Sequence, residues 1–211
     1  MKRIINEDEV RAAARSTKII FLDKQSIVTP AAADLAKEKG VIFESIAGTG
    51  EEQSSLGLVQ DHFPVRKVAI GADHGGFTMK EELKPFIEQL GFTVIDLGTN
   101  TPNPCDYPDF AFAVAELVSQ NKVQRGIIID SVGIGSAMAA SRVKGVLAAK
   151  CNNAYEARSS REHNYANVLT MGARMIGIGI AKDIVKVFLQ TPGGAERHQK
   201  RVQKILSYIP K

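Results

Sequence analysis

Residues 125–141 read RGIIIDSVGIGSAMAAS. The apolar run from Gly126 to Ile129 predicts a strand, and the small residues near the end of the stretch predict a helix. Gly133 and Gly135 lie in the loop between them, where backbone amides suit a bound anion. Asp130, the first residue after the strand, places a carboxylate beside these amides. The stretch therefore predicts a strand–loop–helix unit with a ligand site, and it leaves the purpose of the carboxylate open.

From residue 67 onward, strand-like and helix-like segments alternate along the chain. Strands are predicted at 67–72, 92–98, 126–130, 145–151 and 167–173, and helices at 76–91, 110–121, 154–164, 177–191 and 195–208. Strict alternation is typical of an α/β fold whose parallel sheet carries helices on both faces. The pattern therefore predicts a five-stranded parallel sheet within one domain.

Residues 1–46 have a different pattern. A short helix is predicted at 6–16 and a strand at 18–23, and a second helix is predicted to begin at Pro30, with Thr29 as its cap, and to end at Gly40. Residues 47–66 are rich in Gly, Ser and Glu at their start and predict a flexible linker. The chain thus divides into a small N-terminal extension (1–46), a linker (47–66) and a main domain (67–211).

Composition excludes several classes of protein. With 211 residues, 44% of them apolar, the chain can bury a core, and it has no run of eighteen apolar residues and no signal-peptide pattern. We therefore predict a soluble cytoplasmic protein that enters no membrane. The two cysteines, Cys105 and Cys151, lack the spacing of a disulfide framework or zinc site. The net charge of +4, without a block of like charges and with 6% aromatic residues, favours a small anionic ligand over nucleic acid.

Polar residues follow several of the predicted strands. In open α/β sheets, ligands bind beyond the carboxyl ends of the strands, so we expect these residues to converge on one rim. They are Asp73 and His74, Tyr107, Asp130, and the pair His163 and Asn164.

Each of these residues also has a purely structural interpretation. Asp73 and His74 suit a turn, Asp130 suits a cap of the following helix, and Tyr107 suits loop packing. His163 and Asn164 suit a pair at a helix end that bonds to the backbone. Cys151 ends an apolar strand, which favours a packed thiol over a nucleophile. Only the convergence of several segments on one edge favours a site. A dinucleotide site is disfavoured, because Met138 stands where the third small residue of the fingerprint would be.

The C-terminal segment GGAERHQKRVQKI carries a second signal. Arg197 and Arg201 are four residues apart, so on a helix both guanidiniums lie on one face and suit a phosphate group. The alternative is a solvated basic face, which Lys200 and Lys204 would share.

Five motifs together resemble one family. GADHGGFTMKEEL, DYPDFA, GIGSAMAASRVKG, REHNYANVLTMGAR and RHQKRV are similar, in order and spacing, to type B ribose-5-phosphate isomerases and galactose-6-phosphate isomerases across residues 67–211. The resemblance implies a Rossmann-like three-layer sandwich, a homodimer or tetramer with sites at the interface, and no metal or cofactor. It also implies that a phosphorylated sugar is interconverted between aldose and ketose through an enediol, with ribose 5-phosphate and ribulose 5-phosphate as the expected pair.

The resemblance also assigns roles to residues. Asp73, His74, Tyr107 and Ser131 would surround the sugar, and amides near Gly133 and Gly135 would face the developing enediolate. His163 would assist ring opening with Asn164 beside it. The phosphate would be held, in part across a subunit interface, by Arg174, Arg197, His198 and Arg201.

Four positions depart from the family pattern. Asp130 stands where many type B enzymes carry a proton-transferring cysteine, Ser131 and Val132 replace Gly and Thr, and Ser141 replaces Asn. An Asp also stands at this place in the A subunit of galactose-6-phosphate isomerase. We therefore hypothesise that Asp130 is the base. The alternatives are a non-catalytic subunit or phosphosugar-binding scaffold, and an isomerase of a six-carbon phosphosugar.

The N-terminal extension has its own resemblance. Its VTPAA.DLAKE.G pattern is similar to N-terminal segments of ethanolamine-utilisation proteins linked to bacterial microcompartments. This resemblance implies a docking module for shell or core proteins and a location inside a microcompartment. The alternative is an inert extension that packs on the main domain.

Overall fold

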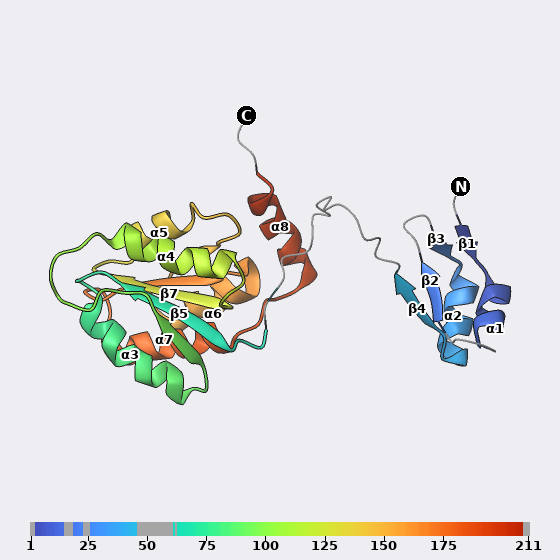
Figure 1. Ribbon diagram of the computed structural model, residues 1–211, viewed down its shortest axis with the longest axis horizontal. Coiled ribbons are helices and arrows are strands. Elements are labelled where there is room, and N and C mark those ends of the chain that lie inside the picture. The colour runs from blue at the N-terminus through green and yellow to red at the C-terminus, as the bar shows by residue number, and fades with distance from the viewer. Residues whose placement is uncertain (1–2, 15–18, 23–25, 46–60, 62, 209–211) are drawn as a thin grey trace. The chain divides into compact units, whose positions relative to one another are not determined.

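The computed structural model describes residues 3–14, 19–22, 26–45, 61 and 63–208 (Figure 1). Contacts between residues divide the chain into two units, residues 1–54 and 55–211. Among the described residues, no helix is long and apolar enough to cross a membrane.

The larger unit is built on a five-stranded sheet in which all paired strands are parallel, in the order β6-β5-β7-β9-β8 (Figure 1). The strands are β5 (Lys67–Ala72), β6 (Thr93–Asp96), β7 (Arg125–Asp130), β8 (Ala148–Lys150) and β9 (Val168–Gly172). The central strand β7 holds the three isoleucines quoted above, all fully or almost fully buried. Ile127 and Ile129 face one layer of helices and Ile128 faces the other, because side chains alternate along a strand.

Helices cover both faces of the sheet. Core residues of α3 (Phe77–Gln89), α6 (Ala154–Asn164) and α7 (Ile178–Gln190) pack on one face, and those of α4 (Tyr107–Ser119) and α5 (Ile134–Ala140) pack on the other. The last helix, α8 (Glu196–Leu206), packs beside α6. Burial of an isoleucine or leucine in these layers contributes about 1.5–3 kcal/mol. The predicted three-layer α/β sandwich with a five-stranded parallel sheet is confirmed.

Glycines let α4 approach the sheet closely. A Cβ atom on Gly126 would lie 2.6 Å from Val114 Cγ1, and one on Gly71 would lie 2.8 Å from Val114 Cγ2. Any larger residue at either position would push α4, and with it Tyr107, away from the sheet.

Most predicted elements agree with the structure to within a few residues, but α4 begins at Tyr107 instead of residue 110. Pro108, in the first turn, has the fixed φ angle that a helix start requires. Tyr107 is therefore held by a helix end.

The smaller unit contains α1 (Glu7–Ala14) and α2 (Pro30–Lys39), with β1 (Arg3–Ile5) parallel to β3 (Ser26–Val28) and β2 (Ile19–Leu22) parallel to β4 (Ile42–Ser45). The caps of α2 are confirmed: Thr29 Oγ1 accepts the N–H of Ala32, and Gly40 is left-handed. The sequence predicted only one of the strands of this unit, at residues 18–23. The others are too short to give a periodic signal, yet they complete a small apolar core. Most of the predicted linker lies outside the described residues.

Candidate active site

The carboxyl ends of β5, β7 and β9 are joined by backbone hydrogen bonds. The Asp73 N–H donates to the Ile129 carbonyl at 3.3 Å, and the Ala173 N–H donates to the Asp130 carbonyl at 2.8 Å. The Arg174 N–H also donates to the Ser131 carbonyl at 3.1 Å. Three loops far apart in the sequence therefore meet at this edge of the sheet, as predicted from parallel strands.

Asp73 shapes the first of these loops. It is 6% exposed, and its Oδ1 accepts the N–H groups of Gly75 at 2.9 Å and Gly76 at 3.1 Å. A Cβ atom on Gly75 would collide with the Ser131 hydroxyl, so Asp73, Gly75 and Ser131 form one close-packed group. The turn predicted for Asp73 is present, and it brings the carboxylate next to Ser131.

His74 contacts the loop that follows β6. Its Nδ1 lies 3.2 Å from both the backbone nitrogen and the backbone oxygen of Cys105, and 4.0 Å from the Cys105 sulfur. The imidazole is therefore held through Nδ1, and its other ring nitrogen is the one available to a ligand.

Tyr107 lies directly over Gly135. A Cβ atom at Gly135 would lie 2.5 Å from Tyr107 Cζ and 2.8 Å from its hydroxyl oxygen. Tyr107 is 39% exposed, so its phenol borders the glycine loop while remaining open to a ligand. Tyr107 therefore lies beside the segment that follows β7, in keeping with the expectation that these residues converge on one rim.

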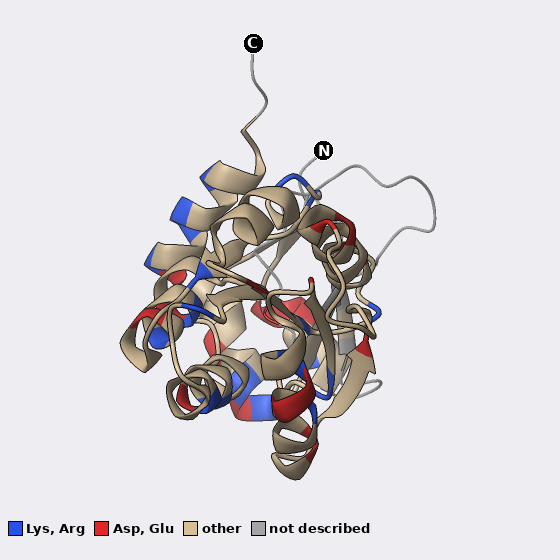
Figure 2. Ribbon diagram, turned by 90° about the vertical axis from the view of Figure 1, so that its left-hand side faces the viewer, with Lys and Arg blue, Asp and Glu red and all other residues tan. Residues whose placement is uncertain are grey.

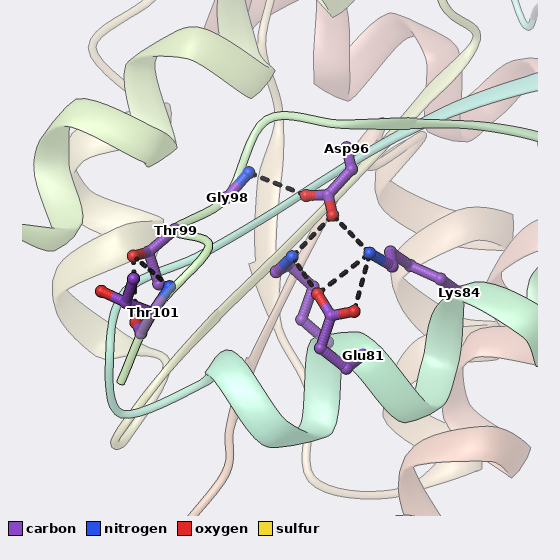
Figure 3. A network of polar contacts seen from close by, with 7 residues as sticks. Glu81, Lys84, Asp96, Gly98, Thr99 and Thr101 are labelled. Carbon is purple, nitrogen blue, oxygen red and sulfur yellow. Dashed lines mark hydrogen bonds and ion pairs between the residues drawn. The ribbon is translucent and has the colours of Figure 1, made fainter. Parts of the chain in front are cut away.

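The loop that follows β6 leads to Cys105 and Tyr107. It is anchored by a network of charged residues at the end of β6 (Figure 3). Asp96 Oδ2 accepts from Nζ of Lys80 at 2.6 Å and of Lys84 at 2.7 Å, and Asp96 Oδ1 accepts the Gly98 N–H at 2.9 Å. Burial raises the pKa of Asp96, but its bonds to Lys80 and Lys84 outweigh burial and hold the pKa below its usual value. The network fixes the strand end from which the loop of Thr99 and Thr101 departs.

The carboxylate of Asp130 bonds to its own loop. Oδ1 accepts the N–H groups of Val132 at 2.7 Å and of Gly133. Oδ2 accepts both the N–H of Ser136 at 3.1 Å and its hydroxyl at 2.5 Å. The side chain is 6% exposed. The alternative interpretation of Asp130 as a helix cap is thus borne out in one respect, because the Ser136 amide belongs to the first turn of α5.

These bonds change the chemistry expected of the glycine loop. Gly133 has a φ of +86°, which a residue with a side chain rarely adopts, and its carbonyl accepts the Thr170 hydroxyl at 2.7 Å. The loop is therefore fixed in shape, and its Gly133 amide faces the Asp130 carboxylate. This amide was expected to face a developing enediolate. In the structure, its N–H instead donates to the Asp130 carboxylate.

His163 and Asn164 do not lie at this rim, so the expectation that they converge there within one chain is wrong. They end α6, which returns from the carboxyl end of β8 to the amino end of β9. Asn167, three residues further on, donates to Leu147 and accepts from Gly126 at the starts of β8 and β7. A helix that leads into a parallel strand ends at the amino edge of the sheet.

A second cluster lies at this amino edge. The rings of His163 and His198 are 4.5 Å apart, and His163 Nδ1 lies 3.2 Å from the Ser159 hydroxyl. Basic residues recur along α8 (Figure 2), and Arg197 and Arg201 are exposed on it, one turn apart. A cavity of about 330 Å³ is lined by Glu162, His163, Pro192, Gly193, Gly194, Ala195, Arg197 and His198.

The electrostatics of this cavity favour an anion. Burial, together with the charges of Arg197, His163 and Arg201, holds the pKa of His198 below its usual value. In the described part of the chain, neither Arg197 nor Arg201 has a carboxylate within ion-pair distance, whereas Lys200 pairs with Glu196 at 3.1 Å. An anion in the cavity would meet the guanidinium of Arg197, which has no competing carboxylate among the described residues.

Arg174 is separated from the other proposed phosphate ligands. It follows β9 and is exposed at the carboxyl edge, whereas Arg197, His198 and Arg201 lie at the amino edge. Within one chain, the four predicted phosphate ligands therefore do not form one group.

Two residues at these clusters were not predicted from the sequence. Ser136 is fully buried and bonds twice to Asp130, and Asp61 bonds to buried arginines at the amino edge. The position of Ser136 in the first turn of the helix after Asp130 was a usable signal. Asp61 lies within the predicted linker, where nothing in the sequence marks it.

Comparisons with known proteins agree with this architecture. The family described as Ribose/Galactose Isomerase matches residues 68–205. Ribose-5-phosphate isomerase B of Escherichia coli is 40% identical over 141 residues, covering 67% of this chain and 95% of that protein. D-erythrulose-4-phosphate isomerase of Pectobacterium atrosepticum is 36% identical over 143 residues, covering 67% and 93%. The structure of ribose-5-phosphate isomerase B from Clostridium thermocellum matches with a TM-score of 0.65 at 46% identity, covering 66% and 95%.

The fold and the two polar clusters define an α/β enzyme of the sugar-phosphate isomerase class. The chain belongs to the ribose/galactose isomerase family, because the family match spans more than half of its length. The prediction of an aldose–ketose isomerase is confirmed at this level.

Proposed function

We propose that this chain interconverts ribose 5-phosphate and ribulose 5-phosphate through an enediol. The observation that carries the proposal is the group formed by Asp73, His74, Tyr107 and the Asp130 loop at one edge of the sheet. Polar side chains around a fixed loop suit a small polyhydroxylated ligand. The names of two relatives support a phosphosugar substrate, with five carbons in one and four in the other.

Asp130 is the proposed base. In the aldose-to-ketose direction, its carboxylate takes the proton from carbon 2 while a second group gives a proton to the carbonyl oxygen on carbon 1, which forms the enediol. The protonated carboxyl then returns its proton to carbon 1, while the hydroxyl on carbon 2 gives its proton back to the second group and becomes the carbonyl. The bond from the Ser136 hydroxyl to Oδ2 must open for this step, and a hydroxyl rotor can turn away. His74 and His163 are the other proposed proton-handling groups.

The proposed site takes its residues from two copies of the chain. The proposed base lies at the carboxyl edge, and His163, Asn164 and the phosphate-binding cations of α8 lie at the amino edge, so one copy cannot place both around one sugar. A homodimer or tetramer with sites at the interface brings the carboxyl edge of one copy to the amino edge of the next. In that arrangement, Arg174 approaches the phosphate from the side of the base.

Phosphosugar binding without turnover is a second candidate function. It is favoured by one observation, the four hydrogen bonds that engage both oxygens of Asp130. A carboxylate that holds its own loop is a structural element, and the chain would then be a binding scaffold or the non-catalytic member of a pair.

Solvent exchange separates the two candidates. We expect incubation of the wild-type protein with ribose 5-phosphate in D₂O to place deuterium on carbon 2, because only a competent base exchanges that proton. The measurement is NMR, repeated with four- and six-carbon phosphosugars to define the substrate. Saturable binding of every sugar without exchange would favour the scaffold.

For the N-terminal extension, residues 1–46, the proposed role is docking to a microcompartment shell or core protein, with the part of the predicted linker that precedes Asp61 as a tether. Support comes from its separate apolar core and from Ile4 and Ile27, which pair across β1 and β3 and are 60% and 47% exposed. Deletion of residues 1–60 should abolish co-purification with microcompartments while leaving isomerase turnover intact. Unchanged co-purification would assign the extension to packing instead.

A further inference from the structure

Two arginines are buried at the amino edge beside the cavity. Arg125 begins β7 and Arg161 lies in α6, and each is 1% exposed. Both guanidiniums donate through Nη2 to the same oxygen of Asp61, Oδ1, at 2.7 Å for Arg125 and at close range for Arg161. A buried cation without a partner is strongly destabilising, so Asp61 neutralises a charge that the domain carries in its interior.

The second oxygen of Asp61 makes a different contact. Oδ2 accepts the backbone N–H of Gly193, in the segment that joins α7 to α8. Burial raises the pKa of Asp61, but the Gly193 N–H and the two guanidiniums outweigh burial and hold the pKa below its usual value. Asp61 is therefore an anion that links the two arginines to the segment 191–195.

The same segment is held by α6 and by the residue that caps it. Arg161 Nε donates to the Thr191 carbonyl at 3.1 Å, and the Tyr165 hydroxyl donates to the Gly194 carbonyl. A Cβ atom on Gly193 would collide with the Tyr165 ring, and one on Gly194 would collide with the Glu162 backbone. The segment is packed too closely to shift without losing one of these contacts.

The position of this segment sets the geometry of the cavity. Gly193 and Gly194 line the cavity together with His163, Arg197 and His198. Arg197 and His198 lie in the first turn of α8, only a few residues beyond Gly193. A displacement of Gly193 therefore moves the start of α8 relative to His163.

We propose that Asp61 is a positioning residue, which fixes the segment 191–195 so that Arg197 and His198 face His163 across the cavity. The inference rests on the proposed role of this cavity in holding the sugar phosphate. Asp61 precedes residues 68–205, which the family match covers. The stretch that connects the N-terminal unit to the isomerase domain thus contributes a residue that shapes the phosphate site.

The test is Asp61→Asn in the full-length protein. The asparagine side chain can keep its oxygen on the two arginines, which turns its NH₂ group against the Gly193 N–H. The variant therefore breaks the segment contact, and it also removes the negative charge that faces Arg125 and Arg161. We expect hydrogen exchange to become much faster at the amides of residues 191–198 than in β7, where it rises only with the loss of global stability. KM for the phosphosugar should rise about tenfold while kcat stays within twofold, because the ligands are displaced and the base is not.

Arg125→Met is the matched control. It removes one guanidinium from the same carboxylate, and the hydrogen bonds of that guanidinium go to Asp61 and the Gln124 carbonyl instead of the segment 191–195. We expect a lower Tm with KM and exchange at 191–198 near the wild-type values. If Asp61→Asn does not fold, the double variant Asp61→Asn/Arg125→Met leaves one unpaired guanidinium instead of two and should show the same rise in KM.

Two results would overturn the inference. One is unchanged hydrogen exchange at residues 191–198 in Asp61→Asn. The other is a rise in KM and in exchange in Arg125→Met that equals the rise in Asp61→Asn, because the effect would then come from lost stability. If the wild-type protein turns over no phosphosugar, the proposed function fails, and the exchange comparison still decides the role of Asp61.

Discussion

The two edges of the sheet differ in how their polar groups are satisfied. At the carboxyl edge, Asp73 and Asp130 bond to amides of their own loops, and Tyr107 packs against a glycine. At the amino edge, Arg197 and Arg201 have no carboxylate partner within the described residues, and the cavity beside them is open. The carboxyl edge is therefore preorganised by internal bonds, whereas the amino edge carries the cations of the proposed phosphate site.

This difference indicates a division of labour. Proton transfer needs groups that are fixed before the substrate arrives, because a preorganised environment costs no reorganisation in the transition state. Phosphate binding needs cations that are not already neutralised. Since the two requirements are met at opposite edges, a second copy of the chain is part of the proposed catalyst.

The largest effect is expected from Asp130→Asn. Loss of the carboxylate should lower turnover about a hundredfold to ten-thousandfold, the usual contribution of a general base. Phosphate binding at the other edge should persist, as measured by calorimetry with the phosphosugar. Asp183→Asn, at an exposed carboxylate on α7, is the matched control and should retain full activity. Wild-type turnover in Asp130→Asn would remove Asp130 from the catalytic step.

A smaller effect is expected from Arg197→Met. Removal of one charge-assisted contact to phosphate should raise KM about tenfold or more with little change in kcat. Lys200→Met removes a cation from the same helix, but that lysine is already paired with Glu196. Equal changes in KM for the two variants would show that α8 acts through its general charge instead of a phosphate contact.

Complementation between two inactive variants tests the separation of the edges directly. Asp130→Asn and His163→Ala, refolded together, should recover about a quarter of wild-type activity, because half of the random dimers carry one intact site out of two. Each variant refolded alone should stay inactive. Absence of recovery in a mixture that forms heterodimers would mean that both edges act within one chain.

The smallest effect concerns the protonation of His198. An anion in the cavity should raise the pKa of His198 from its lowered value, so binding takes up a proton and affinity increases as pH falls through the pKa of the complex. NMR titration of the imidazole with and without sulfate, which does not itself titrate in this range, measures the shift. Arg197→Met should raise the pKa in the ligand-free protein. An identical pKa with and without sulfate would place the anion elsewhere.

The fold and part of the site followed from local patterns. The isoleucines of β7, the alternation of segments and the caps of α2 each depend on residues within a few positions of one another. The gathering of Asp73, Tyr107 and Asp130 followed from the rule that parallel strands end at a common edge. The same rule places the end of α6 at the amino edge, because α6 leads into the parallel strand β9. The position of His163 at that edge could therefore have been predicted from the order of the elements.

By itself, the sequence determined the order of strands and helices and the place of Asp130 at a strand end, because hydrophobic period and turn chemistry are local properties. The tertiary structure alone decided which groups donate hydrogen bonds to the Asp130 oxygens. It also decided that Asp61 accepts a hydrogen bond from Gly193, 132 residues further along the chain. A hydrogen bond depends on ångström-scale positions, and these are fixed only when helices pack on the sheet and bring distant loops together.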